Sequence, residues 1–200
     1  MLAALLDHCQ ETAFCNCAFQ VVVLLLVGLV IGFVCVVFLG LGLYSETGQA
    51  PGLANGQLAP CPNKPNCVSS ESAPSDEHAI AAFNVAANMG EEPLLKVKEV
   101  IKLLGGDVNY ADEAYLASTF KSGLFGFVDD VEFRFDQASG LLHVRSASRV
   151  GYSDLGANRK RVEQIRALIA NGHPITKVTR LLKVSPKTIY KVMRSSEENP

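Results

Sequence analysis

The longest apolar pattern in this chain lies near its amino terminus. Val21–Tyr44 is a run of twenty-four residues without a charge, which at about 1.5 Å per helical residue spans a hydrocarbon core of roughly 30 Å. No later segment is comparable, so a helix buried in a soluble core is a poorer interpretation. A cleaved signal is the alternative, but residues 1–20 contain Asp7 and Glu11 and no Lys or Arg. We predict a flank over 1–20 and one transmembrane helix over 21–44.

Downstream of this run, the pattern indicates one α+β domain over residues 61–166. Residues 45–60 are rich in Gly, Pro and polar residues without an apolar period, which is typical of a tether. A weak Ala-rich pattern over His78–Met89 predicts a short helix. Pro93–Leu104 is a clearer one, with proline in its first turn and Gly105-Gly106 as its stop.

Alternating residues then predict a small antiparallel sheet. Asp107–Tyr110 and Ala114–Phe120 are short candidate strands, and Gly126–Asp136 is a stronger one, with Phe and Val at odd positions and charged residues at even positions. One face should therefore be core and the other solvated. Matching inward positions across the next turn predicts a register with the pairs 135/142, 133/144, 131/146 and 129/148, which sets Glu132 opposite Arg145.

This register sets Asp129 on the apolar face, with Ser148 opposite and Arg149 next along the chain. A carboxylate in that position needs hydrogen-bond donors or a shifted pKa. It is either a structural acceptor, the interpretation that we favour, or part of a site.

The cysteines and the charges place further limits on function. In the segment CPNKPNC, turn-forming residues bring Cys61 and Cys67 close enough for a disulfide in an oxidising compartment, with two reduced thiols or half of a metal site with His78 as alternatives. We expect no metal and no cofactor. The sequence assigns no state to Cys9, Cys15, Cys17 and Cys35.

The charges are divided unevenly along the chain. Residues 1–156 hold 8 basic and 17 acidic residues, net −9, whereas residues 157–194 hold 10 basic residues and one acidic residue, net +9. The basic segment indicates either an acidic partner, such as nucleic acid or anionic lipid, or a solvated helix face.

Three motifs occur in order: CPNKPNCVSS, FVDDVEFRFD and HVRSASRVGYSDLGANRKRVEQIR. Over about 58–166 the chain resembles the uncharacterised family catalogued as domain of unknown function fourteen ninety-nine. The resemblance implies a small exported or membrane-tethered α+β protein and no known activity. It singles out Cys61, Cys67, Ser69, Ser70, His78, Asp129, Asp130, Arg145, Ser146, Ser148, Arg149, Asp154, Asn158, Arg159 and Arg161.

This set contains no defined nucleophile–base pair. Ser69 or Ser70 with His78 and Asp129 is a weak candidate for a hydrolase triad, since nothing in the spacing fixes its geometry. The arginines beside Ser146 and Ser148 can bind a small anionic ligand, or they can form an internal ion network with the aspartates, which we favour. The chain is therefore more consistent with a binding protein than with an enzyme.

A different resemblance begins at about residue 162. Residues 162–194 are similar to the helix-turn-helix of invertases and resolvases, with a basic tail over 167–200. The candidate nucleic-acid contacts are Lys177, Arg180, Lys187, Thr188, Tyr190 and Lys191. The predicted fold is thus α+β, with a single amino-terminal transmembrane helix, a small antiparallel sheet with flanking helices, and a trihelical helix-turn-helix-like tail.

The first resemblance implies an exported domain, whereas the second implies a tail that meets DNA in the cytoplasm. The two conflict, because a single span holds everything after it on one side of the bilayer. We favour a non-enzymatic, single-pass membrane protein whose domain binds a membrane-protein partner or a small anionic ligand on the exported side. The alternatives are a membrane-tethered cytoplasmic DNA-binding protein and a serine hydrolase.

Overall fold

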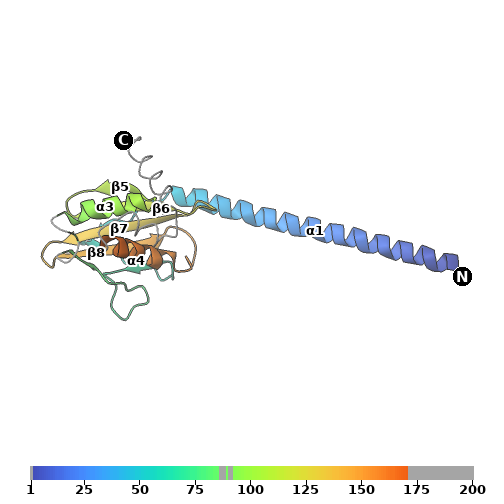
Figure 1. Ribbon diagram of the computed structural model, residues 1–200. Helices are drawn as coiled ribbons and strands as arrows, with labels where there is room; N and C mark the ends of the chain where they lie inside the picture. The colour runs from blue at the N-terminus through green and yellow to red at the C-terminus, as the bar shows by residue number, and fades with distance from the viewer. Residues whose placement is uncertain (1, 86–88, 90–91, 171–200) are drawn as a thin grey trace, which may run out of the picture. The chain divides into compact units, whose positions relative to one another are not determined.

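The computed structural model describes residues 2–85, 89 and 92–170, with side chains from Gln20 onward (Figure 1). The chain divides into two compact units, Met1–Leu41 and Gly42–Pro200. Helix α1 runs over Leu2–Glu46, and its part Gln20–Glu46 is long and apolar enough to cross a membrane. The expected span at 21–44 lies inside this segment.

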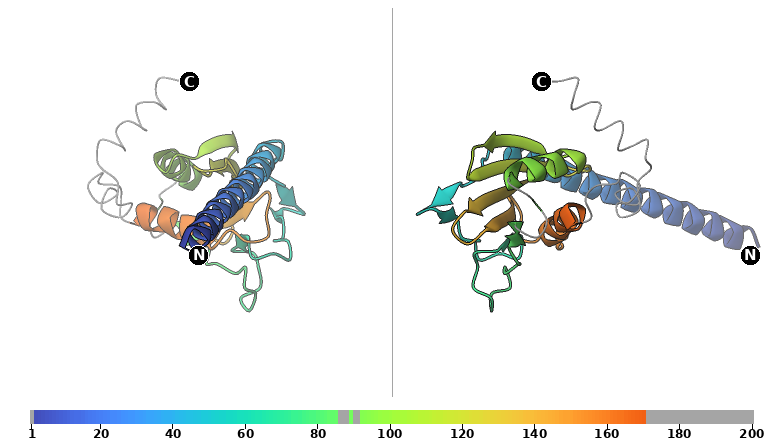
Figure 2. Two further views of the ribbon diagram at one scale, coloured as in Figure 1. Left: turned by 90° about the vertical axis from the view of Figure 1, so that its right-hand side faces the viewer. Right: turned by 60° about the vertical axis from the view of Figure 1, so that its left-hand side comes forward.

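The second unit is built on an antiparallel sheet with the strand order β3-β8-β7-β6-β5, and the short β4 pairs with β8 beyond the end of β3. The bounds are β3 Cys67–Ser69, β4 Phe83–Asn84, β5 Asp107–Ala111, β6 Tyr115–Lys121, β7 Val128–Asp136 and β8 Leu141–Ser148. Two helices, α3 (Pro93–Leu103) and α4 (Ala157–Ala170), pack side by side on one face of the sheet (Figure 2). The fold is therefore α+β, as predicted.

The register of the central hairpin is confirmed. Phe135 pairs with Leu142, Phe133 with Val144, Val131 with Ser146 and Asp129 with Ser148. The odd positions of β7 face the helices and form the core with the apolar faces of α3 and α4. A one-residue slip would have turned these side chains away from the helices, so the apolar alternation fixes the pairing.

The second face of the sheet is a correction to the sequence analysis. Instead of being solvated, it buries Glu132 completely and leaves Asp130 only 4% exposed. Residues 45–60, expected to be a tether, include the hairpin of β1 (Leu53–Ala54) and β2 (Gln57–Leu58), which lies against this face. We call residues 47–61 the strap, and we call the two sheet faces the helix face and the strap face.

The helix expected over His78–Met89 is also wrong for most of its length. Residues 78–82 are turn or irregular backbone, and Phe83–Asn84 form β4 on the edge of β8. Phe83 packs edge to face on Phe133, at 5.8 Å between ring centroids. The aromatic contact with the core thus overrides the helix propensity of the neighbouring alanines.

Candidate functional site

The helix face holds a closed polar network where α4 meets the sheet. Arg161 donates to Asp129 Oδ2 at 2.6 Å and to Asn158 Oδ1 at 2.6 Å. Ser146 donates to the same Asn158 oxygen, and the Asn158 amide nitrogen donates to Ser148 Oγ at 3.0 Å. Asn158 and Ser146 are fully buried. The hydrogen bonds are satisfied within the domain, so this network docks α4 onto β7 and β8.

Asp154 and Arg159 fix the start of α4 through bonds to backbone groups. Within the described part of the chain, neither forms an ion pair with another candidate residue. Asp154 accepts backbone N–H groups from Gly156 and Asn158, which caps the first turn of the helix. Arg159 donates to the carbonyl oxygens of Glu77 and Ala79, which fastens the loop after the disulfide to the helix.

The strap face holds a second network, centred on Glu132. Arg145 Nη1 donates to Glu132 Oε2 at 2.9 Å, and both side chains are more than nine-tenths buried. The other oxygen, Glu132 Oε1, accepts from the Tyr115 hydroxyl at 2.6 Å and from the backbone N–H of Gly52 in the strap at 2.9 Å. Burial and the bond to Glu132 raise the pKa of Tyr115 well above its usual value, so Tyr115 stays a donor. The buried carboxylate thereby holds the strap on the sheet.

A second ion pair lies beside this carboxylate. Arg149 binds Asp130 through two parallel hydrogen bonds, Nε to Oδ2 at 2.9 Å and Nη2 to Oδ1 at 2.7 Å. Its third nitrogen, Nη1, donates to the carbonyl oxygen of Ser45 at the end of α1, at 3.0 Å. In turn, Ser45 Oγ accepts the first N–H of β7, from Val128. Arg149 thus joins the end of α1, just before the strap, to the sheet, and its donors are engaged by protein acceptors.

Between the strap and the sheet lies a pocket of about 540 Å³. The floor comes from β5, β6 and β7 and includes Asp107, Thr119 and Asp130, while one wall is the strap from Gly48 to Gly52. Tyr110 and Tyr115 also line it, with ring centroids 6.1 Å apart. Two aromatic rings beside carboxylates and a hydroxyl suit a polar ligand or the side chains of a partner. We take this pocket as the candidate site.

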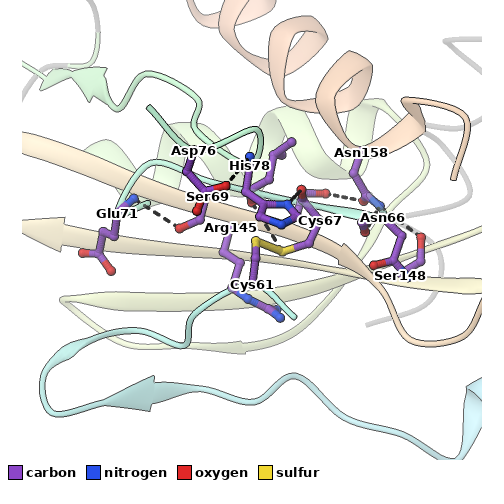
Figure 3. The surroundings of a disulfide bond; sticks show 12 residues. Cys61, Asn66, Cys67, Ser69, Glu71, Asp76, His78, Arg145, Ser148 and Asn158 are labelled. Carbon is purple, nitrogen blue, oxygen red and sulfur yellow. Dashed lines mark hydrogen bonds between the residues drawn. A yellow bond between two sulfur atoms is a disulfide. The ribbon is translucent and has the colours of Figure 1, made fainter. Parts of the chain in front are cut away.

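The strap ends at a disulfide, as the sequence analysis predicted (Figure 3). Cys61 bonds to Cys67 on β3, with their Cα atoms 5.7 Å apart. Beside this bridge, His78 Nδ1 donates to the Cys67 carbonyl oxygen at 2.9 Å. The bridge therefore ties the end of the strap covalently to the sheet.

The structure does not bring the hydrolase candidates together. The buried Ser69 Oγ accepts the backbone N–H of Glu71, and Ser70 Oγ lies 3.2 Å from His143 Nδ1 instead of facing His78. Asp129 is engaged on the opposite face by Arg161. A triad needs the serine and the acid on different nitrogens of one imidazole, and these contacts do not supply that arrangement.

Sequence reasoning missed a third cluster on the strap face. Arg134 Nε donates to Glu71 Oε1 at 2.8 Å, and Glu71 Oε2 accepts the backbone N–H of Leu58 in the strap. His143 lies beside this pair, and burial lowers its pKa below the ordinary value. The signal that could have found the cluster is the register itself, because Arg134 and His143 are cross-strand partners.

Two buried polar atoms lack a hydrogen-bond partner among the described residues, Arg145 Nε and Asn66 Oδ1. Arg145 extends from the strap face of β8, the same face as the disulfide (Figure 3). Within the described ranges, no group of His, Cys, Asp and Glu side chains is placed to hold a metal ion. Lys177, Arg180, Lys187, Thr188, Tyr190 and Lys191 lie outside the described residues.

Together the fold and the site define a small α+β domain whose sheet carries ion pairs on both faces, one covered by helices and the other by a strap. The chain belongs to the family described as "Protein of unknown function (DUF1499)", whose model matches residues 57–169. Residues 155–196 match the helix-turn-helix domain of resolvase. Both resemblances drawn from the sequence are thereby confirmed. No curated protein and no solved structure matches the chain.

Proposed function

We propose that this chain is a membrane-anchored, non-enzymatic binding protein whose α+β domain faces an oxidising compartment and takes its ligand or partner in the pocket under the strap. The observation that carries the proposal is the strap, which starts at the end of the apolar helix, walls the pocket and ends in the Cys61–Cys67 bridge. In this way the membrane segment and the pocket share one continuous piece of chain.

The disulfide supports the choice of compartment. Structural disulfides persist on the exported side of membranes and are rare in the cytosol. Because the proposed span precedes both cysteines, the whole domain would lie on the same side of the membrane as the disulfide.

The pocket supports a binding role. Its lining includes three acidic residues, Glu46, Asp107 and Asp130, and two basic residues, Lys121 and Arg149. Both basic side chains are paired, Lys121 with Glu46 and Arg149 with Asp130. The remaining carboxylate, Asp107, makes the pocket favour uncharged polar or cationic groups over anions.

Topology is tested by thiol labelling in intact cells that express the full-length protein with Cys9, Cys15, Cys17 and Cys35 replaced by serine. The proposal predicts that a membrane-impermeant maleimide labels Cys61 and Cys67 only after a membrane-impermeant reductant is added. As the control, Ser139→Cys, on the exposed turn between β7 and β8, should react without reductant. If labelling at all three positions requires cell lysis, the domain faces the cytoplasm and the proposal fails.

Binding is tested with a photoreactive amino acid at Thr119 on the pocket floor and, as a control, at the exposed Gln137. We expect an adduct at 119 alone, lost when Ala117→Arg fills the pocket, with denaturant unfolding of this variant as the check that the domain still folds. Equal adducts at both positions, or none at 119, would argue against the pocket as the binding site.

DNA binding is the second candidate function, and the resolvase match supports it. However, the first helix of that match is α4, whose apolar side chains Val162, Ile165 and Leu168 are already buried in the α+β core. In a free helix-turn-helix domain the same face would pack on the next two helices.

This alternative predicts that the full chain in detergent micelles retards duplex DNA at low salt. The double variant Lys187→Ala/Lys191→Ala should then abolish retardation, while Lys98→Ala/Lys102→Ala on α3, which removes the same charge, should not. Equal loss in both variants would indicate nonspecific attraction.

A further inference from the structure

One end of the sheet is fixed to the last turn of α1. At Gly42 any side chain would clash with the carbonyl oxygen of Phe125, in the loop between β6 and β7. Three residues later, Ser45 accepts the first N–H of β7 and receives a hydrogen bond from Arg149 at the end of β8. The chain therefore enters the domain at the end where β6 and β8 stop and β7 starts.

The β6–β7 loop displays apolar side chains at this end. Leu124 is 79% exposed, and the rings of the partly buried Phe125 and Phe127 lie 6.1 Å apart in the same loop. Three hydrogen bonds close the loop, among them Ser122 N–H to the Phe127 carbonyl at 2.8 Å and Phe127 N–H to Ser122 Oγ at 2.9 Å. This exposed leucine is thus held in place by an ordered turn.

The loop from β8 to α4 also displays apolar side chains at this end of the sheet. It starts at the same end of the sheet, because Ser148 is the cross-strand partner of Asp129 at the beginning of β7. Tyr152 is 70% exposed and Leu155 is 97% exposed. Leu155 also has φ 54°, a conformation that is uncommon for any residue with a side chain. Its N–H is bound by Ser153 Oγ, so the loop holds a strained leucine out in solvent.

We propose that Leu124, Tyr152 and Leu155 insert into the interfacial region of the bilayer from which α1 emerges. This inference rests on the membrane anchoring proposed above. The candidate span, Gln20–Glu46, ends in the residues that contact this end of the sheet, so membrane anchoring would bring that end to the bilayer surface. Aromatic and aliphatic side chains on ordered loops are typical interfacial anchors, and they would hold the pocket at a defined height above the lipid.

The chain contains no tryptophan, so a single substitution gives a clean probe. We would place Leu124→Trp, Tyr152→Trp and Leu155→Trp one at a time in the full-length protein, reconstituted in pure phospholipid vesicles. Ile31→Trp, within the span, and Gln137→Trp, on the turn between β7 and β8 at the opposite end of the sheet, are the two references. The measurement is fluorescence quenching by lipids brominated near the headgroup or near the chain end.

The proposal predicts that probes at 124, 152 and 155 are quenched by shallow bromines much more than the probe at 137, whereas the probe at 31 is quenched by deep bromines. If the probe at 31 is quenched but all three loop probes behave like 137, the loops do not touch lipid and this inference fails while anchoring stands. If the probe at 31 is also unquenched, the membrane anchoring itself fails. Because the vesicles contain no other protein, quenching cannot come from a protein partner.

Discussion

The two faces of the sheet carry similar residues and put them to different use. On the helix face, Asp129, Arg161 and Asn158 form a closed network under α4. On the strap face, Glu132 and Arg145 are more deeply buried than Asp129 and Arg161, but they hold the strap instead of a helix, and a pocket lies next to them. A helix satisfies its own backbone, whereas the strap needs outside acceptors for its N–H groups. The buried carboxylates Glu132 and Glu71 supply them.

This difference separates two structural roles among the residues that the family motifs highlight. Those on the helix face fix the position of α4 through hydrogen bonds within the domain. Those on the strap face fix a segment whose removal would open the pocket. Substitutions can disrupt either face, and we expect the two faces to differ in how stability and labelling of the pocket change.

The largest effect is expected from breaking the buried ion pair on the strap face. Arg145→Met leaves Glu132 as an uncompensated buried charge, and we expect the domain to lose about 3–5 kcal/mol of stability. Denaturant unfolding measures this loss. The double variant Glu132→Leu/Arg145→Met should recover part of it, because it removes both charges together but leaves the Tyr115 hydroxyl and the Gly52 N–H without their acceptor. Equal losses in the single and double variants would contradict the assignment of a coupled pair.

A smaller loss is expected on the helix face. Asn158→Ala removes the acceptor of the buried Ser146 hydroxyl and the donor to the Ser148 hydroxyl, and should cost about 3 kcal/mol. Since the Asn158 side chain bonds to Ser146, Asn66, Ser148 and Arg161 and not to the strap, photolabelling at Thr119 should be unchanged after correction for the unfolded fraction. Reduced labelling of the folded protein would show that the two faces are coupled.

Removing the disulfide should cost still less. The bridge closes a loop with a sequence separation of only 6, for which chain entropy gives about 2 kcal/mol. Cys61→Ser/Cys67→Ser should therefore fold, with a lower melting temperature and with faster proteolysis within residues 47–61. Cleavage that begins elsewhere in the domain would contradict the role of the bridge as a clasp for the strap.

The smallest expected effect is a pH dependence from His143. Burial lowers its pKa in the folded state, so the unfolded chain binds the proton more tightly. Stability should accordingly fall as pH drops below about 6.5, the ordinary histidine value, and through the lowered pKa. His143→Gln should flatten this part of the stability–pH curve. If the slope of the stability–pH curve is the same in His143→Gln, the pH dependence comes from other groups.

The fold was predictable where alternation is strong and less so where polar residues are buried. The odd apolar positions of β7 were enough to fix the β7–β8 register and the Glu132–Arg145 pair. The same alternation predicted a solvated second face, because a charged residue gives no sign in the sequence of whether its partner will bury it. The strap was missed for a related reason: its backbone bonds to Glu132 and Glu71 join residues 80 and 13 positions apart. Glycine-rich composition describes a local preference and is silent about such contacts.

The most direct test of the account is amide hydrogen exchange at Gly52 and Leu58 in the full-length protein. If the strap is part of the domain, both amides are protected by their carboxylate acceptors, and Glu132→Gln speeds exchange at Gly52 more than at Leu58. If both amides exchange at the rate of an unstructured peptide while β7 remains protected, residues 47–61 are a free tether and the pocket beneath them does not exist.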